Sequence, residues 1–396
     1  MGQSGAGWCS FPAPNGGWAG PHQAPRMFLH ALLEGACPTV WGPLPYGVFS
    51  ANESRMPSLT LYLYRNSRGA IDMIGDVLNM DGSFHLSFLD SLMADTLSFF
   101  YRHLLPTPCL SFRFDEITGG FDQLPEAFYK SMHRDIQFQS TVAKILHDNE
   151  KVRVFYHRPL TRLLSSVTAD YVLVATTAKA VRLIKFSPPL SSNKTHALRS
   201  LHYSQAVKIF LACREKFWEK DGIYNGRSIT DRPSRFIYYP GHNFSSGVGV
   251  ILASYTWDND AEFFIPLSDE KCVDLVQEDL AEIHQLPKTY IRNVCDKHVI
   301  KKWGLDKYAM GAYVSLTPYQ LVDYSKALFQ NEGRVYFAGE YTAHPHAWIE
   351  TAMKAAMRAA RSIHGAVNAS PSELGWGGVV RGLIPSPSHF PLVLLA

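Results

Sequence analysis

Apolar positions along the chain follow two periods, and together they predict both strands and helices. Near the C-terminus an apolar run at residues 335–338 ends at Gly339, which predicts a short buried strand and a turn. After a polar loop, apolar residues recur at helical spacing at Ile349, Met353, Ala356, Ala360 and Ile363. The first turn of such a helix has unpaired N–H groups and a partial positive charge. We therefore expect this segment to bind an anion or an electron-rich carbonyl.

The rest of the pattern predicts an α/β domain that is interrupted by an α+β domain. An unbroken apolar run at residues 171–175 is typical of a strand covered on both faces, and Thr176 and Thr177 open the next helix. Residues 203–302 alternate β-rich runs with a long helix, at 269–286, that ends before a proline. Helical spacing also predicts a helical region within residues 69–105, whereas the Gly- and Pro-rich ends of the chain predict irregular structure.

The composition is that of an ordinary globular protein and indicates a small substrate. The 396 residues are 46% hydrophobic and 18% charged, with a net charge of +3 and no basic block. We therefore expect no nucleic-acid partner, and without an apolar run of about 18 residues we expect no membrane span. The six cysteines form no CxxC pair and leave the compartment open. Sequons at Asn52, Asn193, Asn243 and Asn368 permit glycosylation, although the N-terminus lacks the basic and apolar stretches of a signal peptide.

Five positions are candidates for chemistry. Glu340 follows the predicted strand, where a carboxylate either accepts hydrogen bonds from ligand hydroxyls or caps the following helix. Lys208 interrupts the apolar strand "QAVKIF" and either extends its amine to solvent or serves a site. Trp348, taken alone, is more typical of a packing anchor. His344 and His346 flank a proline without further ligands at useful spacing, so we expect surface loop histidines and no metal.

Several long stretches of the sequence resemble one enzyme family. They include "FDEITGGFDQLPEAF", "SVTADYVLVATTAKAVRLIKFSPPL", "PSRFIYYPGHNFSSGVGVI", "LDKYAMGAY" and "GRVYFAGEYTA". These stretches closely resemble the vertebrate L-amino-acid oxidases of the venom and leukocyte type, within the flavin amine oxidase superfamily. The resemblance runs continuously from about Gly69 to His364.

This resemblance implies a fold, a reaction and a cofactor. The fold is the glutathione-reductase-like FAD fold, α/β plus α+β, with a helical domain and a substrate domain. The reaction transfers a hydride from the α-carbon of an L-amino acid to FAD, and the resulting imino acid hydrolyses to a 2-oxo acid and ammonia while O2 becomes hydrogen peroxide. Apolar or aromatic substrates, a possible homodimer and a secreted or lysosomal location are the corresponding expectations.

On the same basis we divide the chain into six segments. They are an irregular N-terminus (1–54), a helical domain (55–122), a first part of the FAD-binding domain (123–199), a substrate-binding domain (200–325), a C-terminal part of the FAD-binding domain (326–366) and an irregular tail (367–396).

The resemblance also implies roles for individual residues. Glu340 matches the glutamate that binds the sugar-alcohol chain of FAD, and Val142 matches a backbone contact on its adenine side. Tyr255 matches a tyrosine that binds the substrate carboxylate, and Lys208 matches a lysine that holds a water near the flavin. The flavin-contacting start of a helix is matched by Ala347, Trp348, Ile349, Glu350, Thr351 and Ala352, of which the first two also lie beside the substrate. Lys208 and Trp348 are therefore the catalytic candidates.

Cys213 and Cys295 match a disulfide-bonded pair of the family. Disulfides persist in oxidising compartments, so this implied pair favours a secretory route.

Departures from the family pattern define two alternatives. The family begins with a strand and a GxGxxG turn that hold the FAD pyrophosphate, whereas the nearest string here, "GQSGAG" at residues 2–7, fails that spacing. The early segment that supplies an arginine for the substrate carboxylate is not recognisable either. Ala94 stands where venom enzymes have a histidine, and Ala347 stands where a glycine is usual. We therefore expect an N-terminally altered form without the first βαβ unit, in which the strands at 171–175 and 335–338 border an unfilled sheet position. One alternative function is a non-catalytic member that does not retain FAD, and the other is an amine or polyamine oxidase.

Overall fold

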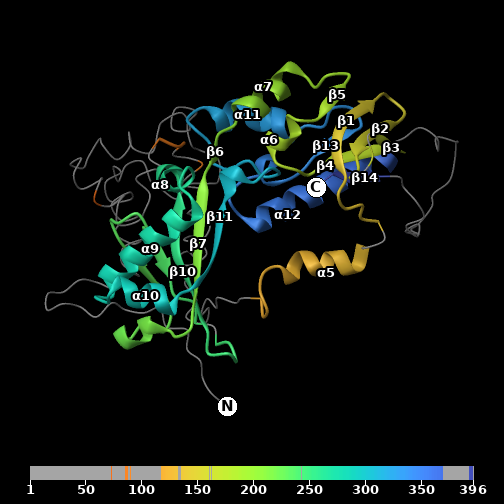
Figure 1. Ribbon diagram of the computed structural model, residues 1–396. Helices are drawn as coiled ribbons and strands as arrows, with labels where there is room; N and C mark the ends of the chain where they lie inside the picture. Colours follow the sequence, from red (N-terminus) through yellow and green to blue (C-terminus); the bar gives the residue numbers. More distant parts are fainter. Residues whose placement is uncertain are drawn as a thin grey trace, which may run out of the picture. The chain divides into compact units, whose positions relative to one another are not determined.

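Two compact units make up the chain (Figure 1). The computed structural model describes residues 117–368 apart from 133–134, 160, 162 and 242, the C-terminal residues 392–395 and, nearer the N-terminus, residues 73, 85–87 and 90. Unit 1 comprises Met1–Asp90 and His202–Val322, and unit 2 comprises Ser91–Leu201 and Asp323–Ala396. Most of the predicted helical domain, the string at residues 2–7 and Ala94 lie outside the described residues. Within the described ranges, no helix combines the length and hydrophobicity that a bilayer span needs.

Unit 1 is built on a five-stranded antiparallel sheet with the strand order β11-β7-β10-β9-β8. Its strands are β7 (Ala206–Cys213), β8 (Arg227–Ile229), β9 (Phe236–Tyr238), β10 (Gly249–Trp257) and β11 (Lys297–Lys302). A core on one face of the sheet includes residues of α8 (Asp258–Phe264), α9 (Asp269–Ile283) and α10 (Lys288–Val294). Along β7, Val207 and Ile209 enter this core, so the alternation of a strand turns Lys208 to the other face. Unit 1 also contains the short pair β6 (Tyr203–Ser204) and β12 (Tyr313–Val314), and the 3₁₀ turns η3 (Phe217–Asp221) and η4 (Trp303–Leu305).

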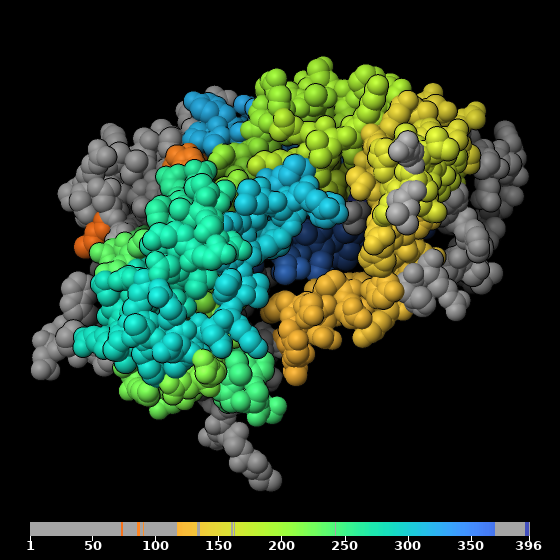
Figure 2. Space-filling model, viewed as in Figure 1, coloured from red at the N-terminus to blue at the C-terminus, as the bar shows by residue number. Residues whose placement is uncertain are grey.

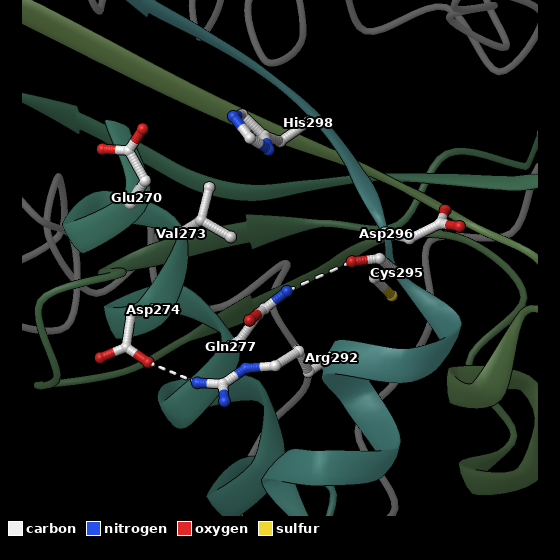
Figure 3. A pocket seen from close by; sticks show the side chains of 8 residues that line it. All are labelled: Glu270, Val273, Asp274, Gln277, Arg292, Cys295, Asp296 and His298. Carbon is white, nitrogen blue, oxygen red and sulfur yellow. Dashed lines mark hydrogen bonds and ion pairs between the residues drawn. The ribbon is translucent and has the colours of Figure 1, made fainter. Parts of the chain in front are cut away.

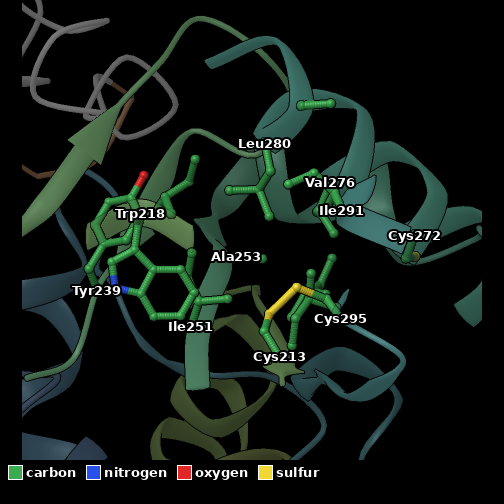
Figure 4. Packing of buried hydrophobic residues seen from close by; sticks show 14 of the residues in the cluster. Cys213, Trp218, Tyr239, Ile251, Ala253, Cys272, Val276, Leu280, Ile291 and Cys295 are labelled. Atoms are coloured by element: carbon green, nitrogen blue, oxygen red, sulfur yellow. A yellow bond between two sulfur atoms is a disulfide. The ribbon is translucent and has the colours of Figure 1, made fainter. Parts of the chain in front are cut away.

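The predicted disulfide lies inside the core of unit 1. Cys213 ends β7 and Cys295 follows α10, and their sulfur atoms are bonded at 2.04 Å. Figure 4 shows the bond within the apolar cluster that also contains Ile251, Val276 and Leu280. The pairing that the resemblance implied is therefore confirmed.

Unit 2 contains two smaller sheets. In the sheet β3-β2-β1-β5, β1 (Thr141–His147) pairs antiparallel with β2 (Val152–His157) and parallel with β5 (Lys185–Ser187), and β3 (Ser165–Ala169) flanks β2. The second sheet is parallel throughout and places β4 (Tyr171–Val174) between β13 (Val335–Phe337) and β14 (Leu392–Leu395). The remaining elements are α5 (Gln123–Met132), α6 (Ala178–Val181), α7 (Ser192–Ser200), η5 (Glu340–Thr342), α12 (Ile349–Asn368) and α11 (Gln320–Phe329), which begins in the last residues of unit 1. No residue of α5 is buried, and Figure 2 shows this helix in orange with its side chains on the surface.

The local sequence explains the parallel sheet. All four residues of β4 are buried, as the unbroken apolar run predicted. The Thr177 hydroxyl accepts a hydrogen bond from the Ala180 amide and caps α6, as the two threonines also predicted. On one side of the sheet, Tyr171 and Leu173 join Ala359 and other residues of α12 in an apolar cluster.

Two expectations about the tail and the sheet are wrong. Residues 392–395 lie in the tail that we expected to be irregular, yet they form β14, because four apolar residues in succession find a partner in the edge of β4. The sheet position beside β4 is accordingly filled by β14 and does not stay open.

The face that α12 buries also differs from the predicted one. The buried residues are Thr351, Ala355, Ala359 and Ile363, whereas Ile349 and Met353 are 60% and 42% exposed. Small alanine side chains let the helix approach the sheet closely, so packing selects the alanine-rich face over the bulkier one.

Candidate functional site

The loop between β13 and α12 is a compact turn with a carboxylate at its centre. Gly339 has a φ of +108°, a conformation that favours glycine, and an added Cβ there would lie 3.5 Å from the Thr176 carbonyl oxygen. Glu340 follows in η5, and its Oε1 accepts a hydrogen bond from the Ala347 amide at 3.0 Å. The carboxylate therefore closes the loop directly before α12. It lies at the carboxyl end of the parallel strands β4 and β13, which is the edge where open α/β sheets bind ligands.

Arg358 of α12 fastens this loop, a role that the sequence analysis missed. Its Nη2 donates to the Thr342 hydroxyl at 3.0 Å and to the Phe337 carbonyl at 3.3 Å, and its Nη1 donates to the Thr342 carbonyl. Thr342 in turn donates its hydroxyl to the Gly339 carbonyl at 2.9 Å. One guanidinium thus joins the end of β13, the turn at Glu340 and the helix. The only signal in the sequence is a charged residue next to Ala359, on the face that becomes buried.

The start of α12 divides the predicted flavin-contacting run into exposed and buried residues. Ala347 has a φ of +69°, which is strained for a residue with a Cβ, and Trp348 is 45% exposed. The Trp348 carbonyl accepts hydrogen bonds from the amides of Thr351 and Ala352 at 3.1 and 3.3 Å, so the helix begins here. Thr351 is buried, whereas Glu350 is exposed and pairs with a lysine one turn later. Trp348 is therefore not a buried packing anchor and has ring surface for a ligand.

Val142 lies in β1 at an irregular point of its sheet. It pairs with Tyr156 of β2, and the register then shifts before Lys144, which marks a β-bulge. A bulge leaves a residue outside the regular ladder of hydrogen bonds. The residue without a ladder partner is Ala143, next to Val142, whereas Val142 itself is paired, so the backbone contact that the resemblance implies for Val142 stays a prediction.

In unit 1, Lys208 and Tyr255 lie directly opposite each other on β7 and β10. The Lys208 Nζ is 4.5 Å from the centroid of the Tyr255 ring. Burial lowers the pKa of Lys208 and raises the pKa of Tyr255. Among the residues that the structure describes, Lys208 has no hydrogen-bond or ion-pair partner, so the amine neither reaches an acceptor nor lies fully in solvent.

Aromatic rings surround this pair on the same sheet. The Tyr255 ring lies 5.0 Å from the Trp257 ring and 6.4 Å from the Tyr238 ring, measured between centroids. The Phe236 ring packs on Trp257 at 5.3 Å. Trp257 was not among the predicted site residues, although its spacing of two residues from Tyr255 within one strand could have indicated it.

The two loop histidines are buried or half-buried, which corrects the expectation of surface histidines. His346 is buried, and its ring lies 4.7 Å from the ring of His344. The His344 ring also lies 5.3 Å from the Phe329 ring, and its Nε2 is 3.1 Å from the Ser325 hydroxyl. Packing on α11 draws these side chains inward, which a loop composition alone does not reveal.

A separate pocket of about 510 Å³ opens on unit 1, and none of the predicted cofactor or substrate residues lines it. Figure 3 shows its walls, which come from α9, α10 and the residues that lead into β11. It is lined by Glu270, Val273, Asp274, Gln277, Arg292, Cys295, Asp296 and His298. An ion pair between Arg292 and Asp274, at 2.8 Å, spans part of this wall. This pocket is therefore not the candidate site.

The residues of unit 2 fit one end of a flavin. A carboxylate next to a helix start offers an acceptor for cofactor hydroxyls, and the partial positive charge of that helix start suits the electron-rich end of the isoalloxazine ring. The exposed Trp348 and Ile349 add apolar surface at the same place. The hydrogen-bonding groups and the apolar surface at residues 339–352 are therefore compatible with a bound flavin.

Comparisons with known proteins find one family that matches most of the chain. Residues 48–364 match the family of flavin containing amine oxidoreductases. The chain is 52% identical over 298 residues to the L-amino-acid oxidase of Echis ocellatus, which covers 75% of this chain and 57% of that protein. The identity is also 52% with the L-amino-acid oxidase of Bungarus fasciatus, with 75% and 55% covered. The chain thus spans little more than half the length of the curated relatives that it matches.

Solved structures share the fold at low sequence identity. A variant of putrescine oxidase superposes with a TM-score of 0.70 at 17% identity, over 90% of this chain and 77% of that one. Cyclohexylamine oxidase from Brevibacterium oxydans IH-35A superposes with a TM-score of 0.54, also at 17% identity, over 63% and 53% of the two chains. The fold is therefore the amine oxidase fold that the sequence predicted, and the family implies a flavin cofactor. This chain belongs to the flavin-containing amine oxidoreductase family.

Proposed function

We propose that this chain forms part of an FAD-dependent L-amino-acid oxidase with apolar or aromatic substrates. The observation that carries the proposal is the loop at residues 339–348, in which the Glu340 carboxylate meets the start of α12. The identity of about half of the aligned residues with curated L-amino-acid oxidases supports the same activity. The net reaction takes an L-amino acid, O2 and water to a 2-oxo acid, ammonia and hydrogen peroxide.

In this proposal the residues of unit 2 hold the cofactor. When bound, FAD would supply the acceptor for the two electrons that end on O2. Glu340 would accept hydrogen bonds from hydroxyls of its sugar-alcohol chain, and the backbone of Val142 would contact the adenine side. The run from Ala347 to Ala352 would offer amides and a helix dipole to the ring, which would stabilise negative charge there.

The residues of unit 1 hold the substrate and a water. The Tyr255 hydroxyl donates to the carboxylate of the amino acid, and Lys208 holds a water. Burial lowers the pKa of Lys208, which makes its amine a weaker base than an exposed lysine. The neighbouring rings of Tyr238 and Trp257 offer an apolar surface, so aromatic and apolar side chains are the favoured substrates.

The visible spectrum of the purified chain tests cofactor retention. We expect flavin absorption bands that stay with the protein through gel filtration. A folded but colourless protein would overturn the oxidase proposal and favour the non-catalytic alternative.

Substrate choice tests the reaction. We expect peroxide from L-phenylalanine and none from amines that lack a carboxylate, and the opposite preference would assign the chain to amine oxidation. Tyr255→Phe should raise KM for phenylalanine about ten-fold or more, because the hydroxyl that donates to the carboxylate is lost. Tyr238→Phe is the matched control, since the neighbouring hydroxyl has no assigned role. Lys208→Met should lower kcat by about 100-fold or more while flavin content stays unchanged.

A secreted or lysosomal location and a homodimer belong to the same proposal. The disulfide within unit 1 supports an oxidising compartment. Asn193 and Asn243, two of the sequon residues, are exposed and open to glycosylation. Secretion from cultured cells with sensitivity to an N-glycosidase tests the location, and light scattering after gel filtration tests the dimer.

A further inference from the structure

We propose that the edge of β4 opposite β13 is an acceptor site for a parallel apolar strand, and that residues 392–395 occupy it as a docked, exchangeable segment. The proposal does not depend on oxidase activity. It concerns the edge of β4 that β14 covers in the strand order β13-β4-β14.

Successive residues of β4 direct their backbone N–H and C=O groups alternately to β13 and to β14. The Val172 amide donates to the Arg334 carbonyl at 3.1 Å, on the side of β13, whereas the Ala175 amide donates to the Leu395 carbonyl at 2.6 Å, on the side of β14. Val172 pairs with Val393 and Val174 pairs with Leu395 in parallel register. Without β14, the polar groups on this second edge would lie unpaired in a strand whose four side chains are all buried. Such an edge is a template for another strand.

Residues 392–395 suit this edge but hold to it weakly. The segment is apolar, "LVLL", and four residues provide few hydrogen bonds. The Leu394 side chain is 56% exposed, and the side chains of Val393 and Leu395 are only partly buried. Backbone pairing therefore contributes much of the attachment, so a second strand with the same chemistry should compete for the site.

The register identifies which residues carry the attachment. In a strand the N–H and C=O of one residue point to the same neighbour, so Leu395 and Val393 direct their polar groups to β4 and Leu394 directs its own outward. Proline lacks the N–H and cannot pair. The variant Val393→Pro/Leu395→Pro should therefore release the segment, whereas Leu394→Lys is the matched control with an exposed side chain and outward polar groups.

Residue-resolved hydrogen exchange on the full chain tests the docking. In the unmodified protein and in Leu394→Lys we expect the amides of Val172 and Ala175 both to be protected. In Val393→Pro/Leu395→Pro the Ala175 amide should exchange about ten-fold faster or more, while the Val172 amide, which bonds to β13, keeps its rate. An unprotected Ala175 amide in the unmodified folded protein would overturn the proposal without any variant.

A peptide tests whether another strand can replace residues 392–395 on β4. The probe is a fluorescent peptide of residues 388–396, "SHFPLVLLA". We expect saturable binding to Val393→Pro/Leu395→Pro that is at least about ten-fold tighter than binding to the unmodified chain, whose own segment fills the edge. The same peptide with proline at 393 and 395 should not bind. Equal binding of the peptide to the unmodified protein and to the proline variant, or no binding to either, contradicts the acceptor site. If the unmodified protein is a dimer and only the proline variant dissociates, the strand on β4 comes from a second copy of the chain.

Discussion

Removal of the disulfide between Cys213 and Cys295 should destabilise unit 1 by several kcal/mol. The bond closes a loop with a sequence separation of 82 residues. The loop-entropy relation then gives about 4.5 kcal/mol at 25 °C for the constraint on the unfolded chain, with measured values more often between 2 and 4 kcal/mol. Both residues are buried, so replacing each sulfur by hydrogen removes about 1 kcal/mol of packing as well.

Single and double variants separate these two contributions. Cys213→Ala loses the cross-link and one buried sulfur, so it should already account for most of the loss. Cys213→Ala/Cys295→Ala should add only about 1 kcal/mol to that. Cys272→Ala, which removes a buried sulfur without a cross-link, is the matched control and should lower stability by about 1 kcal/mol.

Hydrogen exchange in β7 and β10 measures the free energy of opening of unit 1 separately from unit 2. Fluorescence of Trp218, buried in the same core, follows the transition in urea. Thiol titration and mass spectrometry should find the disulfide in the unmodified protein. If the bond is present but Cys213→Ala is no less stable than Cys272→Ala, the cross-link does not constrain the unfolded chain as reasoned here.

Three smaller perturbations test the packing of unit 2. The Lys194 amine donates to the carbonyls of Ala327, within α11, and Gln330, directly after it. Burial lowers the pKa of this amine to about 8, so the unfolded state binds more protons between pH 8 and 10.5 and stability should rise with pH there. Lys194→Met, which leaves these buried carbonyls without their donor, should be destabilising at pH 7 in urea denaturation. Its deficit should grow by about 2 kcal/mol at pH 9.5, because only the unmodified protein gains stability as the pH rises, and a deficit independent of pH would refute the pKa assignment. Arg358→Met should speed amide exchange at residues 339–342 and reduce flavin retention, because the loop loses its hydrogen bonds to the helix. Arg358→Lys should restore part of both, and unchanged amide exchange in Arg358→Met would contradict the role of Arg358 in holding the loop. Ala347→Gly should raise the melting temperature because it relieves strain of about 1 kcal/mol at positive φ, and a lowered melting temperature would argue against that strain.

Much of the fold follows from local pattern. The apolar run at β4, the alternation in β7 and the cap at Thr177 all lie where sequence reasoning put them, because strand burial and helix capping depend on neighbours in the chain. The long helix α9 also begins at Asp269, the first residue of the predicted helix. Its C-terminal limit differs by three residues, since the last turn before Pro287 is not helical.

The sequence indicated some residues of the candidate site and missed others. Glu340 and the start of α12 stood out, because a carboxylate and a helix opening follow a buried strand within a few residues. Arg358 did not, because its partners Phe337 and Thr342 reach it only once α12 folds back on the loop. The predicted segment boundaries and the cofactor and substrate roles stay predictions for the experiments above.

By itself the sequence determined the element types, the family and the strand-turn-helix segment, since each depends on short-range pattern or on long contiguous motifs. Tertiary structure alone decided three things. It chose the alanine-rich face of α12 for burial, because close approach to the sheet favours small side chains. It buried His346 against its neighbours, and it paired residues 392–395 with an edge more than 200 residues earlier in the chain. Such contacts depend on which surfaces meet in space, and local periodicity carries no information about that.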